Sequence, residues 1–229
     1  MARKTKEEAE LTRCSILDAA EQVFQTRGAA GTSLQHIADA AGVTRGAVYW
    51  HFKDKADLFN AMMERVCLPF EESTEAVEQA PPELTLKRLR EHFAFLLDRT
   101  QSSEQVRRVF SIATQMVEYN GELAPVRERR LQWQADHVAL LERALRAARK
   151  AGQVSTTVPL KQAAMGLHAL FDGLLQNWLL QPESFDLRRV GQRTLDLYLA
   201  GLCAGPRSDA ASSSVASPSA RSARARAGA

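Results

Sequence analysis

The chain has 229 residues, of which 45% are hydrophobic and 25% charged, a composition typical of a globular protein with a sizeable core in one or two domains. Its net charge of +3 arises in residues 203–229, which hold four arginines and one aspartate and leave 26 basic and 26 acidic side chains in residues 1–202. The charge balance is therefore no sign of nucleic-acid binding, and a positive surface for phosphates must come from local placement.

Cysteine usage and hydropathy argue against a disulfide-bonded secreted protein and against a membrane protein. Cys14, Cys67 and Cys203 show no metal-binding spacing, and an odd number fits no disulfide framework, so reduced thiols are expected. The chain shows neither a signal peptide nor an apolar run of about 18 residues. We therefore expect a cytoplasmic protein with no membrane partner.

The first predicted helix covers about residues 7–27. It follows the polar opening MARKTKEEAE, whose basic residues could touch a DNA backbone as an arm. Gly28 can end this helix. Its apolar stripe consists of Ile16, Leu17, Ala20, Val23 and Phe24.

Residues 32–58, TSLQHIADAAGVTRGAVYWHFKDKADL, predict two short helices on a tight turn. In the first, Leu34, Ile37, Ala38 and Ala41 recur at helical spacing. Ser33 can cap its start, Gly42 can end it in the left-handed conformation, and Thr44 can cap the second helix. The pattern is typical of a helix-turn-helix.

The second of these helices has the surface chemistry of a DNA reader. Val48 would face the core, while Arg45 could fork onto guanine and Ala47 could meet a thymine methyl group. The alternative is that YWHF forms a small aromatic core and Arg45 is a solvated charge. The candidate DNA-binding residues are Ser33, Gln35, Thr44, Arg45, Gly46, Ala47, Tyr49, Trp50, His51 and Lys55.

The next predicted helix begins near Lys55, where Asp54 and Asp57 form a cap, and it meets Pro69. Because proline removes a backbone hydrogen bond, we expect a kink between about residues 65 and 70. A helix that starts at the DNA-binding domain and bends inside the next domain could carry a signal between the two domains.

The remaining chain predicts five more helices, at about 86–99, 103–119, 123–151, 159–180 and 186–202, and shows no strand signal or internal repeat. The predicted fold is all-α, with about nine helices. Its domains are a DNA-binding domain at 1–55 and a ligand-binding and dimerisation domain at 56–204. The Ala/Ser/Arg-rich tail at 205–229 is predicted to be disordered.

The helix at 159–180 is apolar around most of its circumference, so it needs cover on more than one side. The same pair of helices from a second subunit would supply that cover in an isologous four-helix interface. The alternative is that both helices belong only to the intramolecular core. The candidate interface residues are Leu167, Leu174, Leu175, Trp178, Leu195, Tyr198 and Leu202.

Three segments, TRCSILDAAEQVFQTRG, TSLQHIADAAGVTRGAVYWHFKDKADLF and the opening MARKTKEEAE, resemble the DNA-binding domain of TetR-family repressors, closest to AcrR-like regulators of multidrug efflux pumps. The resemblance is dense over about sixty residues and continues more weakly to about residue 202, through RVFSIATQMVEYNGEL and WLLQPESFDL. It implies a homodimeric repressor that binds a pseudo-palindromic operator and is released by small hydrophobic or aromatic compounds. It also implies dimerisation through the last two helices.

AcrR-like proteins hold a large promiscuous pocket behind the kinked connector. Aromatic and sulfur side chains there would suit flat amphipathic compounds, although such residues at helical spacing can also be ordinary core. The candidate lining is Met63, Cys67, Phe93, Leu96, Phe110, Thr114, Trp133, His137, His168, Phe171 and Asp172.

Catalytic and metal-binding alternatives have little support in the sequence. His168 and Asp172 share a helix face and could hold a metal with His137, but that spacing is a weak signal. No common nucleophile, P-loop or dinucleotide motif occurs. We expect no catalytic residue, metal or cofactor. The alternatives are a TetR-like regulator of another, metabolic or autoregulated target, a DNA-binding protein without ligand, and a small-molecule enzyme.

Overall fold

The computed structural model describes residues 6–203, which form nine α-helices and two short 3-10 turns and contain no strand. The all-α prediction is confirmed. The predicted arm before residue 6 and the predicted tail at 205–229 lie outside the described residues. No helix in the described part is long and apolar enough to cross a membrane.

Three helices, α1 (Lys6–Arg27), α2 (Leu34–Ala41) and α3 (Arg45–His51), form the N-terminal unit. The predicted caps are present: the Ser33 hydroxyl accepts from the His36 amide, and the Thr44 hydroxyl accepts from the Ala47 amide. Gly42 has φ of 66°, a left-handed conformation that glycine adopts without strain. The local sequence therefore fixes the turn between α2 and α3.

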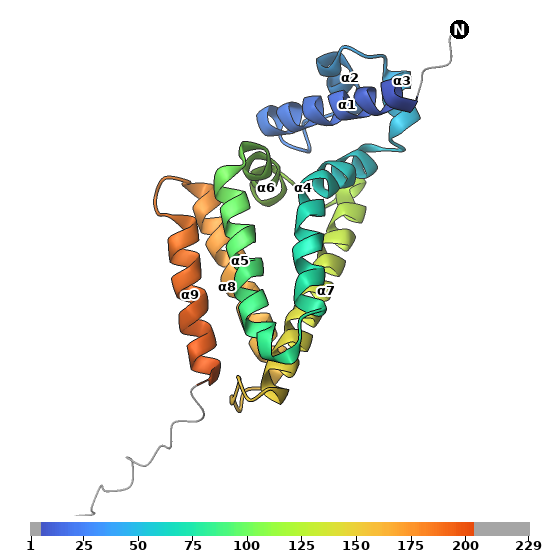
Figure 1. Cartoon of the computed structure of the whole chain (residues 1–229). Coiled ribbons are helices and arrows are strands. Elements are labelled where there is room, and N and C mark those ends of the chain that lie inside the picture. Colours follow the sequence, from blue (N-terminus) through green and yellow to red (C-terminus); the bar gives the residue numbers. More distant parts are fainter. Residues whose placement is uncertain (1–5, 204–229) are drawn as a thin grey trace, which may run out of the picture.

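The long helix α4 (Lys55–Glu78) connects the two units. Its Asp54 cap accepts from the Asp57 amide at 2.8 Å. Pro69 lies inside the helix, where it cannot donate a hydrogen bond to the Arg65 carbonyl one turn earlier. Figure 1 shows α4 changing direction along its length, so proline produces a bend in a continuous helix.

Five helices build the C-terminal unit, with the turn η1 before α5 and the turn η2 before α7. In Figure 1, α5 and α7 run beside the second half of α4, and α8 and α9 lie on the other side of α5, while α6 lies across the upper end of this unit, next to α1. The elements are η1 (Pro82–Leu84), α5 (Thr85–Ser102), α6 (Glu104–Gln115), η2 (Gly121–Leu123), α7 (Ala124–Lys150), α8 (Leu160–Leu180) and α9 (Leu187–Cys203).

Helix α6 is shorter than predicted, because it ends at Gln115 and not near Tyr119. The Tyr119 hydroxyl folds back and donates to the Ala113 carbonyl, and the Arg130 guanidinium donates to the same carbonyl at 3.1 Å. Side chains from outside the helix thus supply the donors that a further turn would have given.

The hydrophobic core runs without interruption through both units. At their boundary the fully buried rings of Phe24 in α1 and Phe59 in α4 meet edge to face, with centroids 5.5 Å apart. Because protein interiors are close-packed, α1 and the first turns of α4 move together.

Candidate DNA-binding surface and ligand site

Helix α3 exposes four of its seven residues to solvent. Val48 is fully buried, whereas Thr44, Arg45 and Gly46 are exposed at the start of the helix. Further along, Trp50 is 72% exposed. The aromatic-core alternative is therefore wrong for most of YWHF, since Phe52 alone of the four side chains is buried. An exposed helix face of this composition suits contact with another molecule.

The predicted guanine reader, Arg45, lies along the surface of α3. Its guanidinium donates to the Tyr49 hydroxyl at 3.1 Å and sits 5.3 Å from the centre of the Tyr49 ring. Since that hydroxyl accepts from Arg45, its own proton can go to a phosphate. The two side chains thus form one preorganised donor surface.

The candidate residues at the start of α2 take part in local contacts. The Ser33 oxygen caps the helix and keeps its hydroxyl proton for an outside acceptor. Gln35 is exposed, and its amide group donates to Asp39 at 2.7 Å. Ala47 is half-buried, as is His51, whose ring meets Trp50 edge to face at 4.5 Å.

Lys55 has a different role from the one predicted. Its ammonium donates to the Ala29 carbonyl at 3.1 Å and the Thr32 carbonyl at 3.0 Å, and it lies 2.8 Å from the Glu122 carboxylate. A lysine has three donors, so none remains for a phosphate. The side chain is only 11% exposed. We therefore correct Lys55 from a DNA contact to a cross-link between the N-terminal unit and η2.

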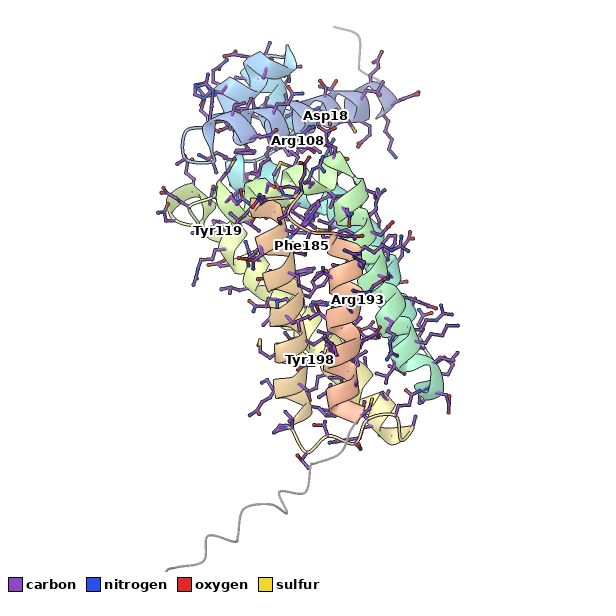
Figure 2. All side chains as sticks on the ribbon, turned by 90° about the vertical axis from the view of Figure 1, so that its left-hand side faces the viewer. Asp18, Arg108, Tyr119, Phe185, Arg193 and Tyr198 are labelled. Carbon is purple, nitrogen blue, oxygen red and sulfur yellow. The ribbon has the colours of Figure 1, made fainter. Side chains whose placement is uncertain are left out.

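A buried carboxylate on α1 forms a second cross-link, which the sequence analysis missed. Glu21 is 1% exposed and pairs with Arg65 of α4, which also binds Asp18 at 2.8 Å. From α6, Gln105 donates to Glu21 at 3.0 Å, and the Arg108 guanidinium lies 3.6 Å away. Figure 2 shows Asp18 and Arg108 at the boundary between the two units. The sequence signal for this cross-link was Glu21 itself, an acidic residue within the apolar stripe of α1.

Five of the predicted ligand-site residues come together between α5, α7 and α8. His137 and His168 have their Nδ1 atoms 3.0 Å apart, and the Trp133 ring stacks on His137 at 5.2 Å. Phe93 and Phe171 meet edge to face at 5.0 Å. The histidines and phenylalanines are buried, whereas Trp133 is 52% exposed. The cluster is therefore apolar with a few inward polar atoms, as binding sites usually are.

The other six predicted residues lie around this cluster or outside it. Phe110 contacts Phe70 of α4 at 6.1 Å, and the Thr114 hydroxyl donates to its own helix. The Asp172 carboxylate accepts from Gln176, so it has a partner other than a metal. Leu96 is core, and Met63 and Cys67 are half-buried on α4. A shallow groove of about 240 Å³ lies elsewhere, between α5 and α9.

Burial controls the protonation of the cluster. It lowers the pKa of His137 to about 3, helped by the neighbouring His92 and His168, and it lowers the pKa of His168 against the opposing effect of Asp172. Burial also raises the pKa of the Cys67 thiol to about 11, which makes that thiol unreactive. At neutral pH the buried imidazole of His137 is uncharged and offers one donor and one acceptor.

A third buried histidine belongs to the cluster and was missed by the sequence analysis. This residue is His92 on α5. Its ring lies 5.8 Å from the His137 ring, and its Nδ1 atom lies 2.8 Å from the Ser73 hydroxyl of α4. Burial lowers its pKa to about 4. The signal was a histidine within the apolar stripe of α5. Among residues 6–203 no group of three or more His, Cys, Asp or Glu side chains is arranged to hold a metal.

The predicted dimer interface needs correction. Leu167, Leu195 and Leu202 are buried within a single chain, and so is Trp178, whose indole donates to the Phe185 carbonyl at 3.1 Å. These four residues belong to the intramolecular core. The Tyr198 hydroxyl donates to the Ala163 carbonyl at 2.7 Å, while Leu174 and Leu175 are half-buried.

The exposed apolar side chains of α8 and α9 lie at other positions. Met165 is 44% exposed, Leu180 71% and Leu197 75%. The two helices lie side by side on the face turned to the viewer in Figure 2. Four of the seven residues predicted for the interface thus lie on the inner sides of α8 and α9, and the exposed apolar side chains of these helices were not among the seven.

Comparisons with known proteins agree with this architecture. Residues 16–62 match the model of bacterial regulatory proteins of the tetR family, and residues 85–203 match that of the C-terminal region of MAATS-type transcriptional repressors. The chain is 36% identical over 203 residues to the HTH-type transcriptional regulator AcrR of Shigella flexneri, covering 87% of this chain and 94% of that protein.

Two solved structures are similar over most of their length. NalD, the secondary repressor of the MexAB-OprM multidrug efflux pump in Pseudomonas aeruginosa, has a TM-score of 0.78 and 36% identity, covering 86% of this chain and 98% of NalD. The complex of triclosan with SmeT, from Stenotrophomonas maltophilia, has a TM-score of 0.75 and 36% identity, covering 83% and 91%. The chain belongs to the tetR family of bacterial regulatory proteins.

Proposed function

We propose that this protein is a ligand-responsive repressor that controls transcription of a multidrug efflux pump and is released from its operator by small hydrophobic or aromatic compounds. The observation that carries the proposal is the connection, through one bent helix, of an exposed reader helix to a buried cluster of aromatic and histidine side chains. The relatives support the target, because NalD represses an efflux pump and SmeT binds triclosan.

The operator is proposed to be a pseudo-palindrome bound by a homodimer. Met165, Leu180 and Leu197 are exposed apolar side chains on α8 and α9 that a second copy could cover, and Ala169 and Gly173 on α8 are small enough for two helices to approach closely. Two copies of α3 then enter successive major grooves, with half-site centres one helical turn apart or a multiple of it. A regulator of this kind works beside the chromosome, in the cytoplasm.

Release is proposed to work through α4. A compound that enters between α5, α7 and α8 displaces side chains packed against the second half of α4, below the bend at Pro69. The ion pairs of Arg65 pass the shift to α1 and so to α3. The two α3 helices of a dimer must lie at one spacing to bind DNA. The compound must bind the conformation with another spacing more tightly, because equal affinity for both conformations would not change their populations.

The test begins with a duplex selected from random DNA by the full-length protein. A reporter promoter carrying that duplex should be silenced by the protein and restored by a compound that binds it. Silencing that no bound compound relieves would contradict the ligand response. Failure to select any sequence over non-specific DNA would contradict DNA-binding repression itself.

A further inference from the structure

His92 lies at the edge of the buried cluster, beside Phe93 and His137. It is 3% exposed, and its ring lies 5.6 Å from that of Phe93 and 5.8 Å from that of His137. Helix α4 covers it on the other side through Ser73. The imidazole therefore lies between the aromatic cluster and the helix that carries the DNA reader.

The hydrogen bonds around Ser73 fix which nitrogen of His92 carries the proton. The Ser73 oxygen lies 2.8 Å from the Phe70 carbonyl and 2.8 Å from His92 Nδ1. A carbonyl only accepts, so the single hydroxyl proton of Ser73 goes to Phe70. Ser73 must then accept from His92, which places the proton on Nδ1. Because the ring is neutral, Nε2 carries a lone pair.

That lone pair is buried without a partner among the described residues, and Nε2 of His137 is in the same condition. A buried acceptor that lacks a donor costs free energy, whereas a donor supplied by a bound molecule would recover it. The His92 acceptor therefore favours a ligand that carries a hydrogen-bond donor, such as an O–H group.

The surroundings define the shape of such a ligand. Phe93 and Phe171 form one apolar wall, and Trp133 stacks on His137 from the solvent side. Trp133 is the most exposed member of the cluster, and its indole occupies a position in which a flat ring stacks on an imidazole. A planar aromatic compound can replace that stacking when Trp133 turns outward.

We propose that this site selects planar aromatic compounds that carry a hydroxyl group, and that Nε2 of His92 accepts the hydrogen bond from that hydroxyl. The inference rests on the proposed ligand response and names the chemistry of the ligand. The methyl ether of such a compound keeps the ring system but offers no donor, so it binds more weakly. Through Ser73 and Phe70, His92 is bonded to α4 directly after Pro69, so the selecting residue touches the helix that carries the signal.

The experiment compares 2-naphthol with 2-methoxynaphthalene, in which a methyl group replaces the hydroxyl proton, by calorimetry on the full-length protein. Wild type should bind the naphthol about tenfold more tightly, the ratio that corresponds to one net hydrogen bond. His92→Phe should bind both probes equally. Ser73→Ala frees the proton to move between the imidazole nitrogens and should reduce the preference, so it serves as a second variant if His92→Phe does not fold.

Phe93→Leu is the matched control, because it alters the apolar wall and leaves the acceptor in place. It should weaken the binding of both probes and leave the ratio of their affinities unchanged. Equal binding of the probes to wild type, binding of neither, or a preference that survives both His92→Phe and Ser73→Ala would overturn the inference. Operator binding without ligand is measured alongside: its absence contradicts the proposed function, whereas intact operator binding with equal probe affinities contradicts only the hydroxyl preference.

Discussion

Arg65 of α4 and Glu21 of α1 form an ion pair across the boundary between the two units, and the Glu21 carboxylate is buried. Arg65 is also the residue whose backbone carbonyl lacks a helical donor, because Pro69 lies four positions later. One residue thus holds the N-terminal unit and lies at the bend of the connector. A displacement of α4 at this point moves α1 with it.

The reader helix predicts the effect of removing its arginine. Arg45→Ala should lower operator affinity by about 1 to 3 kcal/mol and relax the base preference at one position of each half-site. Arg99→Ala, which removes an exposed arginine of α5, is the control with the same charge change. The operator affinities of the two variants are measured at one salt concentration. If Arg45→Ala binds the operator as tightly as Arg99→Ala, Arg45 does not read a base.

The partners of Lys55 predict a loss of stability. Lys55→Met removes a donor from the Thr32 carbonyl and leaves the Ala29 carbonyl with only the Thr32 amide at 3.4 Å, so it should lower the free energy of unfolding by about 1 to 3 kcal/mol. Urea denaturation measures this loss. The salt dependence of operator binding should match that of Lys150→Met, an exposed control on α7. If Lys55→Met instead reduces the slope of log affinity against log salt by about one, Lys55 contacts a phosphate.

The exposed face of α8 and α9 predicts where a charge breaks the dimer. Leu197 is 75% exposed in one chain, so Leu197→Glu should fold normally. In a four-helix interface the charge would be buried without a partner, which is costly. Sedimentation at micromolar concentration should show a monomer with weak operator binding. Leu84→Glu, a charge on η1, should remain dimeric; a Leu197→Glu dimer would refute this interface.

The buried histidines predict that the protein loses stability in weak acid. Unfolded chains bind the protons of these imidazoles below pH about 6.5, but folded His92 takes its proton only near pH 4 and His137 near pH 3. Because the unfolded state then binds more protons, the free energy of unfolding should fall by up to about 1.4 kcal/mol per pH unit for each histidine as pH drops from 6.5 to 4.

Denaturation of wild type and His92→Gln across this pH range tests the histidine account. The variant should show a shallower dependence on pH, since one of the groups has been removed. Identical slopes would mean that His92 takes up its proton in the folded state as readily as in the unfolded state.

The sequence predicted every helix and the turn between α2 and α3, because these depend on local chemistry. Gly42 in the left-handed conformation, the Thr44 cap and the apolar spacing of α2 are all properties of neighbouring residues. The end of α6 was placed too late, since Arg130, a residue of the next helix, donates to its last turn. Distant donors leave no local signal.

The sites were predicted less well for the same reason. Lys55 was assigned to DNA because its partners, Ala29, Thr32 and Glu122, lie far from it in the sequence. Apolar periodicity indicates that a side chain is buried but not whether its own chain or a second one covers it. Trp178 was therefore assigned to the interface, although it lies in the intramolecular core.

The most direct test of the account is the coupling between 2-naphthol and the selected operator, measured in wild type and in Glu21→Gln at one salt concentration. Saturating naphthol should weaken operator binding of wild type about 5- to 150-fold, and operator should weaken naphthol binding by the same factor. Glu21→Gln, which removes the charge that Arg65 holds, should bind naphthol normally and show a smaller coupling. Naphthol bound to wild type with unchanged operator affinity would contradict the account.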